Sequence, residues 1–299
     1  MPERDAAELL RDAKRVVVFT GAGMSAESGV PTFRDAQTGL WARFDAKALA
    51  TPEAFAADPA LVWGWYEWRR AEVERVRPNA GHEAVAAIEA RVPDTVVITQ
   101  NVDDLHERAG SRDPIHLHGS LFAPRCSACA KPAPTASAPP GLPSSTPAPG
   151  SSAPGLSAPG LSAPGSSAPG SSAPGSSAPG SSAPGPAAGE RDGRVMPPAC
   201  AYCGAPVRPG VIWFGEQLSP NALSAATEAA FGCDLLFTIG TSGLVYPAAE
   251  IPYVAARSGA AVVQINPEPT ALDAVADVNL RGPAAQILPD LVARAWGRA

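Results

Sequence analysis

The sequence lacks any run of 18 consecutive apolar residues, the stretch usually taken for a membrane-spanning helix. It also lacks an excess of positive charge, because 23 Lys and Arg stand against 29 Asp and Glu, for a formal net charge of −6. Such a chain has no general electrostatic attraction to nucleic acid or to anionic lipid. We therefore expect neither a nucleic acid nor a membrane among its partners.

The features of a targeting segment are missing from residues 1–15, which carry four acidic side chains among their arginines. Signal peptides are apolar in the middle, and transit peptides are poor in acids. We therefore expect a soluble protein of the cytoplasm. Cysteine is scarce, with five in all, and four of them form two Cys-x-x-Cys pairs. In a reducing compartment such pairs favour metal binding over disulfides.

One internal stretch departs from globular composition. Of the 34 prolines, 17 lie between Lys131 and Ala199, and a unit of the Ser-Ser-Ala-Pro-Gly type repeats seven times from Ser151 to Gly185. The repeat has almost no charge, no aromatic side chain and a Pro-Gly pair in every unit, so it cannot build a core. We expect a disordered low-complexity tether over about residues 131–197.

The flanking segments alternate between short apolar runs and helix-like stretches, which predicts an α/β fold with a Rossmann-like, doubly wound parallel sheet. The strand-like runs are Val16–Phe19, Thr95–Thr99, Leu235–Ile239 and Ala261–Ile265. Helix-like stretches include His82–Arg91 and Asn221–Phe231. Ligands of such sheets bind where the strands end, so the residues after each run are candidate site residues.

The first run is followed by Gly21-Ala22-Gly23-Met24-Ser25-Ala26, a G-x-G-x-x-A turn that lets backbone amides approach a pyrophosphate. Alone this motif is weak, because a turn without any ligand can look the same. An NAD dehydrogenase would show a second strand ending in an acid about 20 residues later. That region holds Leu40-Trp41-Ala42 instead, which disfavours hydride transfer.

Several longer motifs follow in order along the chain. They are Gly21-Ala22-Gly23-Met24-Ser25-Ala26-Glu27-Ser28-Gly29-Val30-Pro31-Thr32-Phe33-Arg34, Thr99-Gln100-Asn101-Val102-Asp103, His118-Gly119-Ser120, the two cysteine pairs, Trp213-Phe214-Gly215-Glu216, Gly240-Thr241-Ser242 and Asn266-Pro267-Glu268. Together they resemble the sirtuin family of NAD-dependent protein deacylases, over the whole chain except the repeat. The resemblance implies removal of acyl groups from lysine, with nicotinamide and O-acyl-ADP-ribose as products.

The resemblance also implies an NAD site. His118 matches the family's general base and Asn101 its catalytic partner, whereas His116 is the structural histidine. Asn101 and Asp103 match the pair that holds the ribose and the nicotinamide amide, and Phe33 lies against the nicotinamide pocket. The full set of implied NAD contacts is Gly21, Ala22, Gly23, Ser25, Ala26, Phe33, Arg34, Trp41, Gln100, Asn101, Val102, Asp103, Gly240, Thr241, Ser242, Asn266, Pro267, Glu268 and Ala284.

Four thiolates in paired Cys-x-x-Cys form the closed shell of a structural zinc ion, here Cys126, Cys129, Cys200 and Cys203. The 70 residues between the pairs exceed the usual spacing of about 15–20. Because closure entropy grows only with the logarithm of loop length, the insertion costs about 1.0–1.2 kcal/mol. Zinc binding contributes roughly 10–16 kcal/mol, so we expect the site to tolerate it. Free thiols that bind no metal are the alternative.

Tyr66 and Arg69 lie three residues apart and so share one helical face. A hydroxyl and a guanidinium together make a carboxylate receptor. They resemble the Tyr-x-x-Arg signature of the sirtuin branch that removes succinyl and malonyl groups, in which an alanine matching Ala50 widens the pocket. A solvated, charged helix face with aromatic packing is the alternative interpretation.

We expect residues 1–122 and 208–299 to form the NAD-binding catalytic domain, and residues 123–207 a small zinc module that contains the tether. The peptide substrate should lie between them as an extended strand, paired with Val211–Gly215, including Trp213 and Phe214, and with Gly243–Val245. We expect a monomer. Three other functions stay open: a plain lysine deacetylase, a mono-ADP-ribosyltransferase of the same fold, and a non-catalytic NAD-sensing scaffold.

Deleting Ser151–Gly185 should leave NAD binding and turnover nearly unchanged, because the repeat buries nothing and shortening a long loop changes its closure entropy little. Steady-state turnover of the deleted and full-length chains measures this. A loss of more than about tenfold, or about 1.4 kcal/mol, would show that the repeat contacts the active site.

Overall fold

The computed structural model describes residues 5–30, 44–133 and 193–297, and all of them belong to one compact unit. The expected tether, apart from its two ends, lies outside these residues, as do Phe33, Arg34 and Trp41. Within the described residues, no helix is long and apolar enough to cross a bilayer. The division into a catalytic domain and a zinc module stays a prediction.

The core element is a six-stranded sheet in the order β3-β2-β1-β6-β7-β8, with every neighbouring pair parallel. Its strands are β1 (Arg15–Thr20), β2 (Asp94–Thr99), β3 (Ile115–His116), β6 (Leu235–Ile239), β7 (Ala261–Ile265) and β8 (Val278–Leu280). The four apolar runs of the sequence are thus confirmed as β1, β2, β6 and β7. The edge strands β3 and β8 are only two and three residues long, too short to give a periodic signal.

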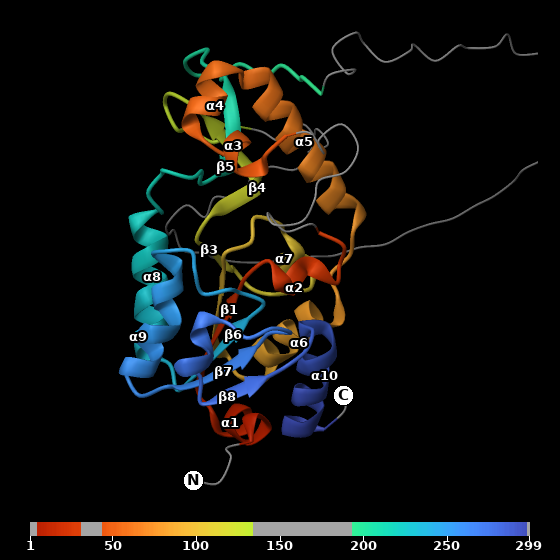
Figure 1. Ribbon diagram of the computed structural model, residues 1–299, viewed down its shortest axis with the longest axis vertical. Helices are drawn as coiled ribbons and strands as arrows, with labels where there is room; N and C mark the ends of the chain where they lie inside the picture. Colours follow the sequence, from red (N-terminus) through yellow and green to blue (C-terminus); the bar gives the residue numbers. More distant parts are fainter. Residues whose placement is uncertain (1–4, 31–43, 134–192, 298–299) are drawn as a thin grey trace, which may run out of the picture. The chain divides into compact units, whose positions relative to one another are not determined.

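Helices cover both faces of this sheet, as a doubly wound fold requires (Figure 1). One face packs against α1 (Ala6–Asp12), α6 (Ala80–Arg91) and α10 (Ala284–Trp296), and the other against α8 (Pro220–Gly232) and α9 (Ile251–Arg257). Val16 and Val18 point to the first face, whereas Val17 and Phe19 point to the second. Because both faces are buried, the strand is apolar at every position instead of alternating.

A second apolar cluster lies outside the sheet. It joins the helices α3 (Ala46–Leu49), α4 (Pro52–Ala57) and α5 (Pro59–Arg75) to the antiparallel strands β4 (Gly119–Cys126) and β5 (Val207–Val211). The Asp58 side chain accepts the Leu61 amide proton at 2.9 Å and Pro59 is the first helical residue, so the sequence sets the start of α5. The remaining short elements are α2 (Gly23–Ala26), α7 (Leu105–Arg108) and the 3₁₀ turns Ala248–Glu250 and Ala271–Ala274.

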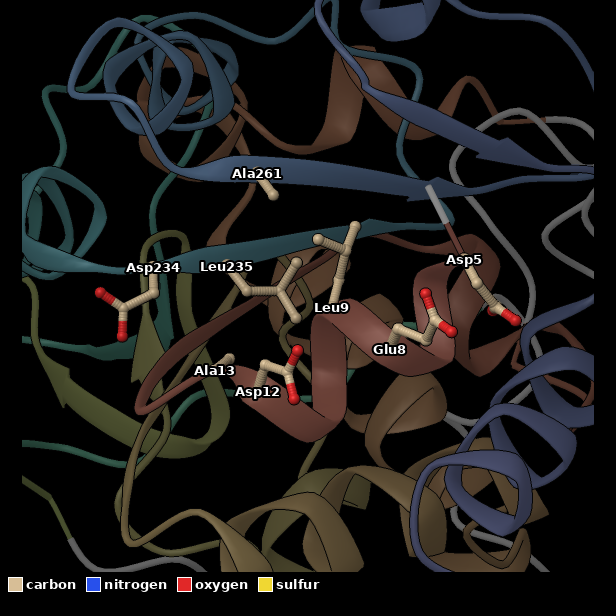
Figure 2. A pocket seen from close by; sticks show the side chains of 8 residues that line it. All are labelled: Asp5, Glu8, Leu9, Asp12, Ala13, Asp234, Leu235 and Ala261. Atoms are coloured by element: carbon tan, nitrogen blue, oxygen red, sulfur yellow. The ribbon is translucent and has the colours of Figure 1, made fainter. Parts of the chain in front are cut away.

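A hollow at the amino-terminal edge of the sheet is lined by acidic side chains of α1 and by Asp234, just before β6 (Figure 2). The Asp234 carboxylate accepts the amide protons of Lys14 and Arg15 at 3.1 and 2.9 Å. Asp5 caps α1 through the Ala7 amide and pairs with Arg294. These carboxylates therefore stabilise the chain locally, at the edge opposite to the one where ligands of such sheets bind.

Candidate functional site

Two turns meet at the carboxyl-terminal edge of the sheet, one after β1 and one after β6. The Gly23 amide donates to the Gly240 carbonyl at 2.8 Å, and the Gly21 amide donates to Ile239 at 2.9 Å. A Cβ atom on Gly23 would lie 2.7 Å from Gly240 Cα, and Gly240 itself has φ +60°. Side chains are excluded here by backbone contact, which explains why the motif needs glycine at these positions.

Ser25, Asn101 and Asp103 form a buried polar cluster beside these turns. The Ser25 hydroxyl donates to Asp103 at 2.9 Å and accepts from the Asn101 side-chain amide at 3.0 Å. Burial raises the pKa of Asp103, while hydrogen bonds from the Leu105 amide and Ser25 oppose that shift. The cluster presents an amide, a hydroxyl and a carboxylate together, the groups that recognise a carboxamide and sugar hydroxyls.

A second polar layer supports this cluster and was not anticipated from the sequence. The Thr99 hydroxyl accepts the Asn101 amide proton at 3.0 Å and bonds to the Thr20 hydroxyl at 2.9 Å. Thr20 in turn bonds to His106 Nε2 at 3.0 Å, and the His106 ring lies edge-on to His82 with centroids 4.9 Å apart. Burial lowers the pKa of His106 to about 3 and that of His82 to about 4. Both rings are therefore neutral at physiological pH.

His118 lies in the turn between β3 and β4, with Nδ1 at 2.9 Å from the Gln100 carbonyl. That carbonyl needs a proton on Nδ1, which leaves the lone pair on Nε2. Burial lowers the pKa of His118, although the bond to Gln100 opposes the shift. By contrast, both ring nitrogens of His116 are engaged, by the Asn101 carbonyl at 3.0 Å and by Glu107 at 2.7 Å, as in a structural histidine.

The other expected NAD contacts lie along the same edge. Gln100 donates to the Thr241 hydroxyl at 2.9 Å, so the turns after β2 and β6 are linked directly. After β7, the Asn266 side chain donates to the Glu268 carbonyl at 2.7 Å. Ala284 is buried at the start of α10, where Glu27 accepts the Ala285 amide proton at 2.8 Å. Ala22 and Ser242 lie in the two turns, Ala26 is the last residue of α2, Val102 follows Asn101, and Pro267 is exposed next to Asn266.

Tyr66 and Arg69 lie on α5 in the second apolar cluster. The Tyr66 hydroxyl accepts the Trp213 Nε1 proton at 3.0 Å and its side chain is 2% exposed, so the solvated-face alternative is wrong for this residue. The Arg69 guanidinium carbon lies 5.1 Å from the centroid of Trp65 and 6.0 Å from that of Tyr66. Burial raises the pKa of Tyr66 to about 12 and lowers the pKa of Arg69. Ala50 is buried in the same cluster.

The segment expected to pair with a peptide runs from Val211, the last residue of β5, to Gly215. Its successive amides are engaged within the chain: Ile212 donates to His118, Trp213 to Glu216 and Phe214 to Ala50. Gly215 has φ +86° and ends the segment in a turn. A peptide strand here would have to use the other backbone groups, so this pairing stays a prediction.

The four cysteine sulfurs lie within 4.8 Å of one another. The Sγ atoms of Cys126 and Cys203 are 3.4 Å apart, and those of Cys129 and Cys200 are 3.7 Å apart. Tetrahedral zinc with Zn–S bonds near 2.3 Å places sulfurs about 3.8 Å apart. Backbone amides also donate to the sulfurs, for example from Cys129 to Cys126 at 3.4 Å. The cluster therefore fits a structural zinc ion with all four positions filled by protein.

Comparison with protein families matches residues 21–247 to the model described as "Sir2 family". An NAD-dependent protein deacylase of Methylococcus capsulatus is 53% identical over 283 residues, covering 95% of this chain and 93% of the relative. The NAD-dependent protein deacylase 1 of Pseudomonas aeruginosa is 50% identical over 293 residues, covering 98% and 99%.

Two solved structures extend this likeness to three dimensions. A Sir2 homologue in complex with NAD is 38% identical, with a TM-score of 0.73 and coverage of 97% of this chain and 92% of the homologue. A second Sir2 protein, bound to a myristoylated histone peptide, is 30% identical, with a TM-score of 0.63 and coverage of 97% and 94%.

Replacing Cys126 or Cys200 with serine should release zinc and destabilise the β4–β5 region, because binding energy at a structural site contributes to folding. Metal analysis and thermal unfolding of the purified variants measure both effects. Cys233→Ser is the matched control, since Cys233 is buried away from the cluster among apolar residues of the α8–α9 face. Wild-type protein purified without zinc would remove the assignment.

Proposed function

The chain belongs to the Sir2 family and is an NAD-dependent protein deacylase, and from this premise we propose that it prefers acyl-lysines whose acyl group ends in a carboxylate. Succinyl- and malonyl-lysine are such groups, with acetyl-lysine a poorer substrate. The observation that carries the proposal is the pairing on α5 of a buried Tyr66 with a half-buried Arg69, beside Trp213. Its protein substrates are bound through an acylated lysine.

The carboxyl-terminal edge of the sheet supplies the NAD side of the reaction. Asp103 can accept a proton from the nicotinamide NH₂ group, and Asn101 and Gln100 face the ribose hydroxyls. Thr241, Asn266 and Ala284 are assigned to the adenosine half. Phe33, Arg34 and Trp41 complete the set by their match to the family motif alone, since they lie outside the described residues.

His118 is assigned as the general base, which takes a proton from a ribose hydroxyl after nicotinamide has left. The bond from Nδ1 to Gln100 supports this role, because it orients the ring and leaves Nε2 to accept a proton. The pKa of His118 is lowered by burial, which favours the neutral, basic form at pH 7.

Tyr66 and Arg69 suit a carboxylate for complementary reasons. A phenol whose pKa is about 12 keeps its proton and can donate it, and a guanidinium adds fixed positive charge. The Asp103 carboxylate acts electrostatically on Arg69 and raises the pKa of its guanidinium, which supports an acyl pocket on the nicotinamide side of the site. An acyl group with a terminal carboxylate would therefore reach Arg69 from the reacting centre.

The alternatives differ in chemistry. A plain deacetylase would use the same NAD residues and make no use of the Tyr66–Arg69 pair. A mono-ADP-ribosyltransferase would transfer the ADP-ribose group to protein, which mass spectrometry distinguishes from deacylation.

Residues 1–122 and 208–299 are assigned to the catalytic domain and residues 123–207 to the zinc module. The protein is assigned as a monomer. A reducing compartment such as the cytoplasm suits the four thiols of the zinc cluster.

Replacing His118 with alanine should abolish deacylation while partly preserving exchange of labelled nicotinamide, because the base acts after nicotinamide has left. Since the pKa of His118 lies below its usual 6.5, wild-type kcat/KM should fall only as the pH drops below that value. His116→Ala is the control for damage to the same loop. Full deacylation by the His118 variant would show that another group is the base.

Succinyl-lysine peptides should exceed acetyl-lysine peptides in kcat/KM by roughly 10- to 150-fold, because a charge-assisted contact contributes about 1.5–3 kcal/mol. Changing Arg69 to methionine should erase most of this preference, because methionine cannot make the charge-assisted contact with an acyl carboxylate.

Steady-state kinetics of matched succinyl and acetyl peptides with saturating NAD give the comparison. Equal kcat/KM for the two peptides in the wild type would leave a general deacetylase. Repeating the series at higher salt measures the burial of the contact, because exposed pairs are screened and buried ones much less so.

A further inference from the structure

We propose that Arg208 is a positioning residue for acyl specificity, acting through Trp213 on the direction of the Tyr66 hydroxyl proton. The inference rests on the proposed preference for acyl groups that end in a carboxylate. It adds a residue outside the acyl pocket itself, because Arg208 is on β5 and its packing reaches Tyr66 through Trp213, while its charge also lowers the pKa of the phenol from a distance.

Arg208 is a buried arginine, 8% exposed, with its guanidinium held on two sides. It bonds to both oxygens of Glu216, at 2.5 and 2.9 Å, and donates to the Val211 carbonyl at 3.1 Å. Burial opposes ionisation of Glu216, but the bonds from Arg208 and from the Trp213 amide lower its pKa overall. A bidentate pair of this kind fixes the plane of the guanidinium.

That plane lies against the indole of Trp213, with the Arg208 guanidinium carbon 3.4 Å from the ring centroid. Glu216 also accepts the Trp213 backbone proton at 2.8 Å, so the same carboxylate holds both partners of the stack. Phe55 packs on Trp213 with ring centroids 5.4 Å apart. The indole is therefore fixed in orientation by one ion pair and by aromatic packing.

The consequence appears at Tyr66. Trp213 Nε1 donates to the Tyr66 oxygen at 3.0 Å, and an indole nitrogen can only donate. The phenol must then direct its own proton to a different acceptor. An acyl carboxylate held by Arg69 would be that acceptor. If the indole turned, the Tyr66 hydroxyl could instead donate elsewhere and would lose its fixed direction.

The central test is Arg208→Lys, because lysine keeps the charge but cannot make the bidentate pair or the planar stack. We expect kcat/KM for a succinyl peptide to fall about tenfold, mainly through KM, while that for the acetyl peptide changes by less than about twofold. Arg70→Lys is the matched control: Arg70 is a buried arginine on α5 that pairs with Glu67, and its substitution should leave the preference intact.

A double-mutant cycle with Tyr66→Phe separates positioning from general damage. If Arg208 acts through the Tyr66 hydroxyl, Arg208→Lys should not reduce the succinyl preference further once that hydroxyl is gone. If thermal unfolding measurements show that Arg208→Lys is not folded, Trp213→Phe replaces it in the cycle. Phenylalanine keeps an aromatic ring and lacks the Nε1 donor.

Two results would overturn the role of Arg208 but leave the proposed acyl preference intact. One is a succinyl preference of the wild type that Arg208→Lys retains, and the other is a double variant in which the losses of succinyl preference from the two single variants add. Equal use of succinyl and acetyl peptides by the wild type would overturn the proposed preference, and the inference with it. A non-additive loss confined to succinyl peptides supports the assignment of Arg208.

Discussion

The site depends on the contact between two turn backbones, those after β1 and β6. Gly23 and Gly240 approach so closely that neither has room for a side chain, and the bond from the Gly23 amide joins the turns. Because β1 is the central strand, between β2 and β6, this contact also sets where Gln100 meets Thr241. A shift of one turn would therefore displace groups on three strands.

Buried polar groups are the second constraint, since each must find a partner or lose stability. Asn101 and Asp103 share the Ser25 hydroxyl, while the Asn101 backbone is held by Thr99. Burial keeps His106 neutral, so it can bond to Thr20 without bringing charge into the core. This layer supports the loop that carries Asn101 and Asp103, the side chains proposed to bind nicotinamide.

The fold could be predicted from the sequence, and candidate site residues could be named, because both leave local signals. Each inner strand is an unbroken apolar run, the cysteine pairs have ligand spacing, and Tyr66 and Arg69 lie one helical turn apart. The contacts that support these residues leave no local signal in the sequence. Glu27 bonds to Ala285 across 258 positions of sequence. Nothing in the sequence distinguishes Arg208 from a surface arginine, and only the structure shows its contact with Trp213. The edge strands, which have only two and three residues, also give no signal in the sequence.

The cysteine cluster and the proposed acyl pocket are joined through the β4–β5 strand pair. In the β4–β5 pair, Cys126 faces Val207 and Arg125 faces Arg208, so Arg208 lies one register step from a zinc ligand. Metal binding energy that holds this register therefore also holds the guanidinium under Trp213. A closed tetrahedral site cannot bind substrate, so any effect on the proposed acyl preference would be indirect. Under the proposal made for Arg208, that effect would pass along the backbone of the β4–β5 pair to Arg208 and from there to Tyr66.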